Sequence, residues 1–115
     1  MSTFSLARGP RGTLGAWETE GQIRFAELDG EHALRSAPGR TGQRKHPSIA
    51  CNRRGEVLLA WTERMGWNKG GSLAWQLFDD HGEPVNGEHG ECAGVPVWGL
   101  VQAVALPDER FAIVY

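Results

Sequence analysis

The sequence lacks the features that mark several large classes of protein. No apolar run approaches 18 residues, so the sequence predicts no membrane-spanning segment. The first residues, MSTFSLARGPRG, contain no apolar core of a signal peptide. With 12 Lys and Arg against 14 Asp and Glu, the net charge of -2 shows no basic excess, which argues against a nucleic-acid partner. No helical period of ten or more residues is present, and prolines interrupt the candidate segments.

Cysteine is also scarce. Cys51 and Cys92 are the only two, too few for a disulfide framework. They could form one disulfide in an exported protein, whereas in a reducing compartment they would be a buried thiol and a spare one. The sequence leaves both alternatives open, and with them the localisation.

Glycine is the abundant residue, at 16 of 115 positions. Most glycines separate short runs rich in Val, Leu, Ile, Ala, Trp and Phe. Short apolar runs punctuated by glycine are typical of strands joined by tight turns. The composition therefore predicts an all-β domain with antiparallel sheets.

Segments of the chain repeat along its length. The matching pairs are 49–61 with 103–115 at an offset of 54, 5–17 with 48–61 with one gap, and 21–29 with 71–79 at an offset of 50. Each unit reads as strand, turn, strand, loop, strand, turn and a weak fourth strand. Four antiparallel strands at this period predict β-propeller blades.

The predicted strands fill about two and a half blades. They are 4–7, 13–18, 21–28 and 32–36 in the first, 47–52, 56–63, 72–79 and 84–88 in the second, and 99–106 and 110–115 in the third. The whole chain, 1–115, is then one partial propeller domain with blades at about 1–38, 39–95 and 96–115. Because a closed propeller needs at least four blades, we expect a fragment of a longer protein, a ring of several chains, or strands that close in some other way.

Two strands carry informative side-chain patterns. Residues 56–62 are almost continuously apolar, which predicts burial on both faces, as in an inner strand between neighbouring blades. Residues 72–79 alternate, with Leu73, Trp75 and Leu77 on one face and Ala74, Gln76 and Phe78 on the other.

The turns between strands carry a family resemblance. The segment 78-FDDHGEPV-85 is similar to the Asp-box of sialidase-like β-propellers, with Asp80 and Gly82 at matching positions and Phe78 and Val85 departing from the pattern. The turns at 10–12, 53–55 and 107–108 lie at equivalent places. The chain thus resembles sialidase-like propellers of the Asp-box repeat type and their non-catalytic relatives in bacterial surface proteins. The resemblance implies an exported parent protein, and the Asp-box itself indicates fold more than activity.

Catalysis is not carried over from the resemblance. Sialidase chemistry, as the family implies, needs an arginine triad, an Asp acid/base and a Tyr nucleophile assisted by Glu. The chain has a single tyrosine, Tyr115, and no complete set. We therefore predict no catalytic residue and no cofactor, and leave open whether the chain has enzymatic activity.

Propeller geometry places the polar residues on two opposite faces. The ligand-binding residues that we predict on the face of the longer loops are Arg44, Lys45, His46, Arg64, Trp67, Lys69 and Trp98, with Arg40 and Glu63 nearby. Cations and indoles suit an anionic or sugar ligand. The opposite face receives Arg53, Arg54, Asp79, Asp80, His81 and Asp108.

Structural roles are the alternative for the same residues. Arg44 to His46 could be a solvated loop in which Arg44 pairs with a carboxylate, and Trp67 could cap the edge of the core. Trp17, Trp61 and Trp75 are expected in the core. Glu18 and Glu63 follow the repeat and are expected to bond loop amides rather than to act in glycosidase catalysis.

A metal site is not predicted. His81, His89 and Cys92 match no standard zinc spacing.

Three functions remain open from the sequence. The first is a non-catalytic propeller segment that binds a carbohydrate or surface ligand, or serves as a scaffold. The second is a fragment of a sialidase-like hydrolase whose catalytic residues lie outside this chain. The third is a small lectin whose chains form a ring through self-association at open blade edges.

Overall fold

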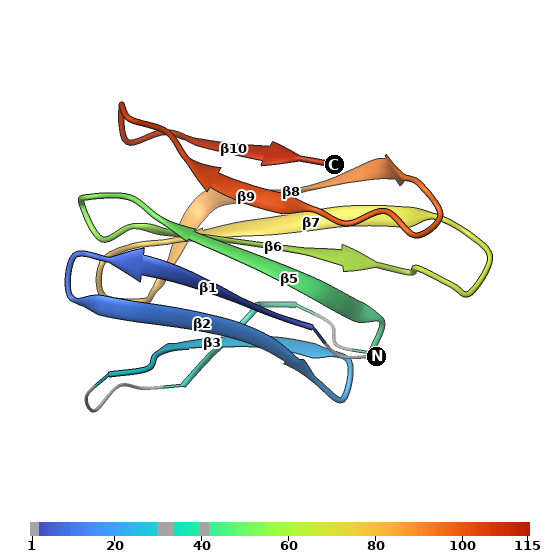
Figure 1. Ribbon diagram of the computed structural model, residues 1–115, viewed down its shortest axis with the longest axis horizontal. Helices are drawn as coiled ribbons and strands as arrows, with labels where there is room; N and C mark the ends of the chain where they lie inside the picture. The colour runs from blue at the N-terminus through green and yellow to red at the C-terminus, as the bar shows by residue number, and fades with distance from the viewer. Residues whose placement is uncertain (1–2, 30–33, 40–41) are drawn as a thin grey trace.

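The chain folds into antiparallel β-sheets (Figure 1). The computed structural model describes residues 3–29, 34–39 and 42–115, and these ranges contain no helix. One four-stranded sheet has the order β1 (Phe4–Gly9), β2 (Gly12–Thr19), β3 (Gln22–Glu27) and β4 (Arg35–Ser36). A second has the order β5 (Arg44–Cys51), β6 (Val57–Glu63), β7 (Gly71–Phe78) and β8 (Pro84–Val95). The hairpin of β9 (Gln102–Ala105) and β10 (Phe111–Val114) follows. The predicted all-β, antiparallel class is therefore confirmed.

Two strand boundaries differ from the prediction for physical reasons. The strand predicted to end at residue 88 continues to Val95, because β8 is an outer strand whose polar side chains remain in solvent while its backbone pairs with β7. The segment 37–46, predicted to be a loop, contributes Arg44 to His46 to β5. A register shift between Lys45 and Ser48 admits Pro47 into that strand. Of the strand predicted at 32–36, Arg35–Ser36 is formed, and residues 32 and 33 lie outside the described ranges.

The repeat in the sequence is also a repeat in strand register. Ser5 pairs with Ala16, and Ser48 pairs with Ala60 at the equivalent position of the second repeat. In the third repeat, Gln102 pairs with Val114 at the same position. The pairing between second and third strands repeats as well, with Ala16 opposite Phe25 and Ala60 opposite Trp75. We call residues 4–36, 44–95 and 102–114 unit 1, unit 2 and unit 3. The register shows that the three units share one local geometry.

In unit 2, both faces of the sheet formed by β5, β6 and β7 are largely buried, whereas the outer strand β8 remains mostly exposed. One apolar cluster joins Leu14, Ile23 and Phe25 of unit 1 to one face of unit 2, including Ile49, Leu59, Trp61 and Phe78. A second cluster joins Leu58, Leu73 and Trp75 on the other face to Val101 and to Ala103 and Phe111 of unit 3. All residues of β6 from Val57 to Thr62 are buried, as the continuous apolar pattern predicted. Trp61 is fully in the core, whereas Trp17 and Trp75 are only partly buried.

A serine hydroxyl links each unit to the next. Ser5 Oγ accepts a hydrogen bond from the backbone N–H of Ile49 at 3.2 Å. Ser48 Oγ accepts one from the N–H of Ala103 at 2.9 Å. Since Ser5 matches Ser48 and Ile49 matches Ala103 in register, the two junctions are built in the same way. Buried backbone N–H groups need such partners, so the serines fix how far each unit is displaced along its neighbour.

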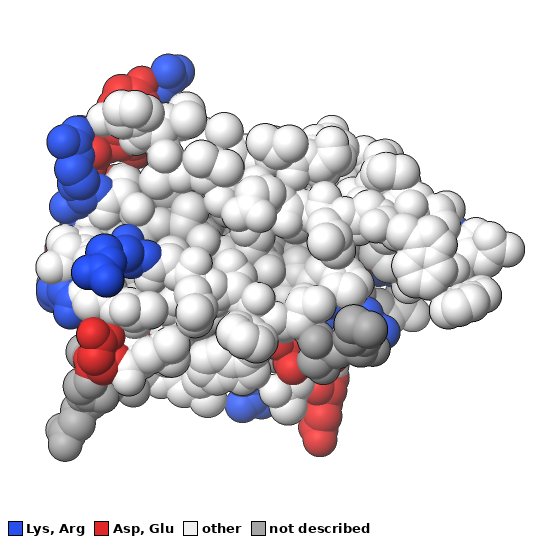
Figure 2. Space-filling model, viewed as in Figure 1, with Lys and Arg blue, Asp and Glu red and all other residues white. Residues whose placement is uncertain are grey.

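The turns and loops separate to the two ends of the molecule (Figure 1). The connections β1–β2, β5–β6, β7–β8 and β9–β10 lie at one end, which we call the turn end. The connections β2–β3, β6–β7 and β8–β9 lie at the other, the loop end. On the face shown in Figure 2, charged side chains gather at the turn end and along one border, and the loop end is mostly uncharged.

The serine junction gives a direct test. Ser48→Ala should lower the free energy of unfolding by about 1–3 kcal/mol, because it leaves the buried N–H of Ala103 without its acceptor. Urea denaturation with circular dichroism measures the change. Ser36→Ala, at an exposed position, is the matched control and should have little effect. A Ser48→Ala protein as stable as the parent would show that the hydroxyl does not hold the junction.

Candidate functional site

Two exposed indoles meet at the loop end. Trp67, in the β6–β7 loop, and Trp98, in the β8–β9 loop, lie with ring centroids 5.1 Å apart and planes at 84°, an edge-to-face contact. Their exposed fractions are 83% and 69%. An edge-to-face pair is a favourable aromatic geometry, but two indoles left so open to water gain little from burial. The sequence predicted both residues at this end, and the structure brings them together.

The backbone around these indoles is tightly built. Gly66 N–H bonds the carbonyl of Lys69, and Gly99 N–H bonds the carbonyl of Pro96 at 2.8 Å. A Cβ on Gly70 would overlap the carbonyl of Val95, so glycine is required where the β6–β7 loop crosses the end of β8. The two loops are therefore packed against each other, and each presents one indole from a closed turn.

Trp98 occupies a left-handed backbone conformation, with φ of 64°. This region is uncommon for residues other than Gly, Asn and Asp, and holding a residue there costs of order 1 kcal/mol. His46 (φ 53°) and Arg64 (φ 60°), two further predicted site residues, share the conformation. Glu20 and Glu109 adopt the same conformation in tight turns, so it shapes the backbone here without marking a ligand site.

Arg44 is buried between unit 1 and unit 2 rather than open to a ligand. Its side chain is paired with Glu63, with Nε 3.3 Å from Oε1, and its guanidinium lies 4.9 Å from the ring centre of Trp61. It also donates to the carbonyl of Ala37 at 3.0 Å and to Oε1 of Gln22 at 2.9 Å. The placement of Arg44 in an exposed loop was thus wrong, because its register partner Glu63 and the stacking on Trp61 draw it into the junction.

Burial also changes the protonation of this region. It lowers the pKa of the Arg44 guanidinium, and the Glu63 carboxylate partly offsets that effect. Burial, followed by the positive charge of Lys45, lowers the pKa of His46, which favours the neutral imidazole near pH 7. The Nδ1 atom of His46 lies 3.3 Å from Thr3 Oγ1.

The other predicted cations remain at the surface. Lys45 and Lys69 are exposed. Arg64 is exposed and contacts Glu91, and it also donates to Ser72 Oγ at 2.7 Å. This contact holds the pKa of the Glu91 carboxyl below its usual range. Among the predicted ligand-binding residues, Lys69 lies two residues after Trp67 in the same β6–β7 loop. Arg40 lies outside the described residues.

The carboxylates Glu18 and Glu63 have structural contacts. Glu18 Oε1 accepts a hydrogen bond from the N–H of Gly21 at 2.9 Å, in the tight β2–β3 turn, as the repeat predicted. Glu63 Oε1 accepts one from the indole N–H of Trp61 at 2.8 Å. Instead of bonding a loop amide, Glu63 thus orients the indole on which Arg44 stacks.

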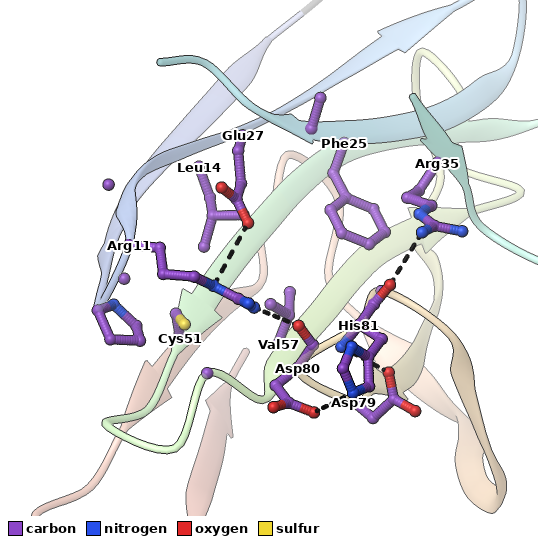
Figure 3. Close-up of a pocket in the computed structure, with 16 residues that line it drawn as sticks. Arg11, Leu14, Phe25, Glu27, Arg35, Cys51, Val57, Asp79, Asp80 and His81 are labelled. Carbon is purple, nitrogen blue, oxygen red and sulfur yellow. Dashed lines mark hydrogen bonds and ion pairs between the residues drawn. The ribbon is translucent and has the colours of Figure 1, made fainter. Parts of the chain in front are cut away.

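A cleft at the turn end escaped the sequence analysis (Figure 3). It has a volume of about 270 Å³ and lies between the unit 1 and unit 2 sheets. Its labelled lining residues are Arg11, Leu14, Phe25, Glu27, Arg35, Cys51, Val57, Asp79, Asp80 and His81. Only the proximity of unit 1 to the β7–β8 turn creates it, and no local motif signals such a contact.

Two arginines of unit 1 cross this cleft to the β7–β8 turn. Arg11 donates to the carbonyl of Asp80, and Arg35 donates to the carbonyl of His81 at 2.8 Å and to Glu83 at 3.1 Å. Their guanidinium groups thus join the two units. A different contact joins unit 2 to unit 3, where Arg53 of the β5–β6 turn donates to Glu109 of the β9–β10 turn at 2.9 Å.

The carboxylate that closes the β7–β8 turn is Asp79. Its Oδ1 accepts hydrogen bonds from the N–H groups of His81 at 2.9 Å and Glu83 at 3.0 Å. The N–H of Glu83 and then that of His81 hold the pKa of Asp79 below its usual range. The Asp-box alignment gave the matching position to Asp80, one residue later. The turn therefore has an Asp-capped geometry, but in a different register from the aligned motif.

Cys51 and Cys92 are both free thiols. Cys51 is half-buried beside the cleft, and burial raises the pKa of its thiol. Cys92 is exposed, with Sγ 3.1 Å from the hydroxyl of Tyr115. Within the described ranges, no group of three or more His, Cys, Asp and Glu side chains is arranged to hold a metal ion. The same part of the chain has no helix capable of crossing a membrane.

Comparisons with known proteins identify no relative. No protein-family model, no curated protein and no solved structure matches the chain.

The buried ion pair gives the second prediction. Glu63→Ala should lower the free energy of unfolding by about 3–5 kcal/mol, because it leaves the buried Arg44 without its counter-charge. Glu91→Ala, which removes the carboxylate of the exposed Arg64 pair, is the matched control and should change stability little. Chemical denaturation of the three proteins at neutral pH measures the difference. Equal stabilities of the two variants would contradict the structural role of the Arg44–Glu63 pair.

Proposed function

We propose that the chain is a non-catalytic segment of a β-propeller and that its loop end binds a carbohydrate. The observation that carries this proposal is the exposed pair Trp67 and Trp98. An indole offers a flat apolar face to the C–H groups of a sugar ring, at low cost in side-chain entropy. The β6–β7 loop also carries the exposed cations Arg64 and Lys69, which supply polar contacts beside the stacking surface.

The repeated junctions support the propeller part of the proposal. Two successive units meet through the same serine contact and the same register, which is the relation expected between neighbouring blades. The strands β1, β5 and β9 are each the first strand of their unit and lie at an edge of its sheet. Apolar clusters lie on both sides of unit 2. Four strands in unit 1 and four in unit 2 agree with the architecture of blades.

The contacts of the loop-end carboxylates favour a non-catalytic role. Glu63 is held by Arg44 and Trp61, and Glu91 by Arg64 and Ser72. A general acid would need a raised pKa, whereas that of Glu91 is lowered. We therefore favour ligand binding over hydrolysis for this chain.

A glycan array tests the proposed binding. The intact chain should bind glycans on the array, and each of Trp67→Ala and Trp98→Ala should weaken binding of the strongest hit about tenfold or more. Isothermal titration with that glycan gives the affinities. Val97→Ala, a neighbouring exposed apolar residue without a ring, is the control and should retain binding.

Two results would count against this function. A folded chain that binds no glycan on the array would leave only the scaffold role. Binding that survives both tryptophan substitutions would place the glycan site away from the indole pair.

A further inference from the structure

Among the residues that the structure describes, two sheet faces have exposed apolar side chains at opposite sides of the stacked units. The first is the side of unit 1 that faces away from unit 2, and the second is the side of unit 3 that faces away from unit 2. We call them the unit 1 outer face and the unit 3 outer face. Each can be compared, residue by residue, with the equivalent face of unit 2, which is buried in a junction.

The unit 1 outer face keeps part of the apolar pattern of a junction, with Arg8 and Arg24 in place of Cys51 and Ala74. Leu6 and Leu28 are 57% and 53% exposed. Their register equivalents in unit 2 are Ile49 and Phe78, both buried against unit 1. Trp17 likewise corresponds to the buried Trp61. An exposed face whose counterpart inside the same chain is a core surface is suited to being covered.

The unit 3 outer face supplies the other half of such a junction. Val104 and Val114 are exposed at positions where unit 2 has Ala50 and Ala60, which are buried against β9 and β10. Ala112 between them corresponds to the buried Leu58. Gln102 stands at the place of Ser5 and Ser48, and its side-chain oxygen can accept an N–H as those hydroxyls do. In a second copy of the chain docked on this face, the donor would be the backbone N–H of Leu6, which is the counterpart of the N–H groups of Ile49 and Ala103.

Charge at the turn end favours the same pairing. The junction between unit 2 and unit 3 already joins a basic turn to an acidic one, through Arg53 and Glu109. At a third junction, the β9–β10 turn, in which Asp108 pairs with Arg110, would meet Arg8 of β1 and the β1–β2 turn that carries Arg11. Both Asp108 and Arg8 are exposed. Opposite charges at this point fix the orientation of docking more than they add affinity.

We propose that the chain associates head to tail with a second copy of itself, the unit 1 outer face of one copy docking on the unit 3 outer face of the other. The contact repeats the junction that the chain makes twice internally. It is heterologous, because two different faces meet, so successive copies form a ring if the rotation closes and a filament if it does not. This association does not depend on carbohydrate binding, and the two have separate readouts.

Single substitutions on each face test the contact. Analytical ultracentrifugation of the intact chain at about 0.1 mM should show association, since a Kd near 10 µM would leave most copies bound at that concentration. Leu6→Glu blocks the unit 1 outer face and Val104→Glu blocks the unit 3 outer face. Each variant alone should be monomeric, and circular dichroism should confirm that it remains folded. Val97→Glu, which adds the same charge at the loop end, should associate like the parent.

Mixing the two blocked variants separates this contact from other modes of association. Leu6→Glu keeps an intact unit 3 outer face, and Val104→Glu keeps an intact unit 1 outer face. The mixture should therefore form a 1:1 dimer and nothing larger. A parent chain that stays monomeric at about 0.1 mM, a folded single variant that still associates, or a mixture that stays monomeric would each overturn the proposal.

Discussion

The structure depends on the burial of both faces of the inner strands of unit 2, β5 to β7. A sheet covered on one side can slide or tilt on its neighbour, whereas one covered on both sides must meet two surfaces in register. The continuous apolar run of β6 makes this possible, because Leu59 and Trp61 face unit 1 while Leu58 and Ala60 face the third segment. Once these side chains are placed, the serine hydroxyls can reach the neighbouring amides and Arg44 can stack on Trp61.

Polar contacts then fix the relative position of neighbouring units, which apolar packing alone does not determine. A hydrophobic face tolerates small displacements, but Ser48 Oγ reaches the N–H of Ala103 in only one position. The arginines act at the outer parts of the same junction, where Arg35 bonds the carbonyl of His81 and Arg53 bonds Glu109. Arg44 does so within the junction, where the charge it buries is paired with Glu63. The junction is thus apolar in the middle and specified by hydrogen bonds around it.

Sequence reasoning found the features that repeat or alternate and missed those that depend on contacts between units. The strand pattern, the double burial of β6 and the opposite faces of β7 were predicted correctly, because side-chain period follows directly from strand geometry. Trp67 and Trp98 were placed at one end, but nothing local indicated that their rings touch. Arg44 was assigned to an exposed loop because a charged run next to glycine and proline indicates one, and its burial depends on Glu63 and Trp61.

The differences between the outer faces and the internal junctions bear on the strength of association between copies. Arg8 and Arg24 of unit 1 stand where unit 2 has Cys51 and Ala74, so docking on this face must partly desolvate two cations. Unit 3 contributes a two-stranded hairpin, where unit 1 and unit 2 each contribute four strands. A contact between copies therefore gains less apolar burial than the junction within a chain, and it must also offset the entropy of bringing two molecules together. We therefore expect the proposed association to be reversible and to depend on concentration, with the internal junctions intact in every copy.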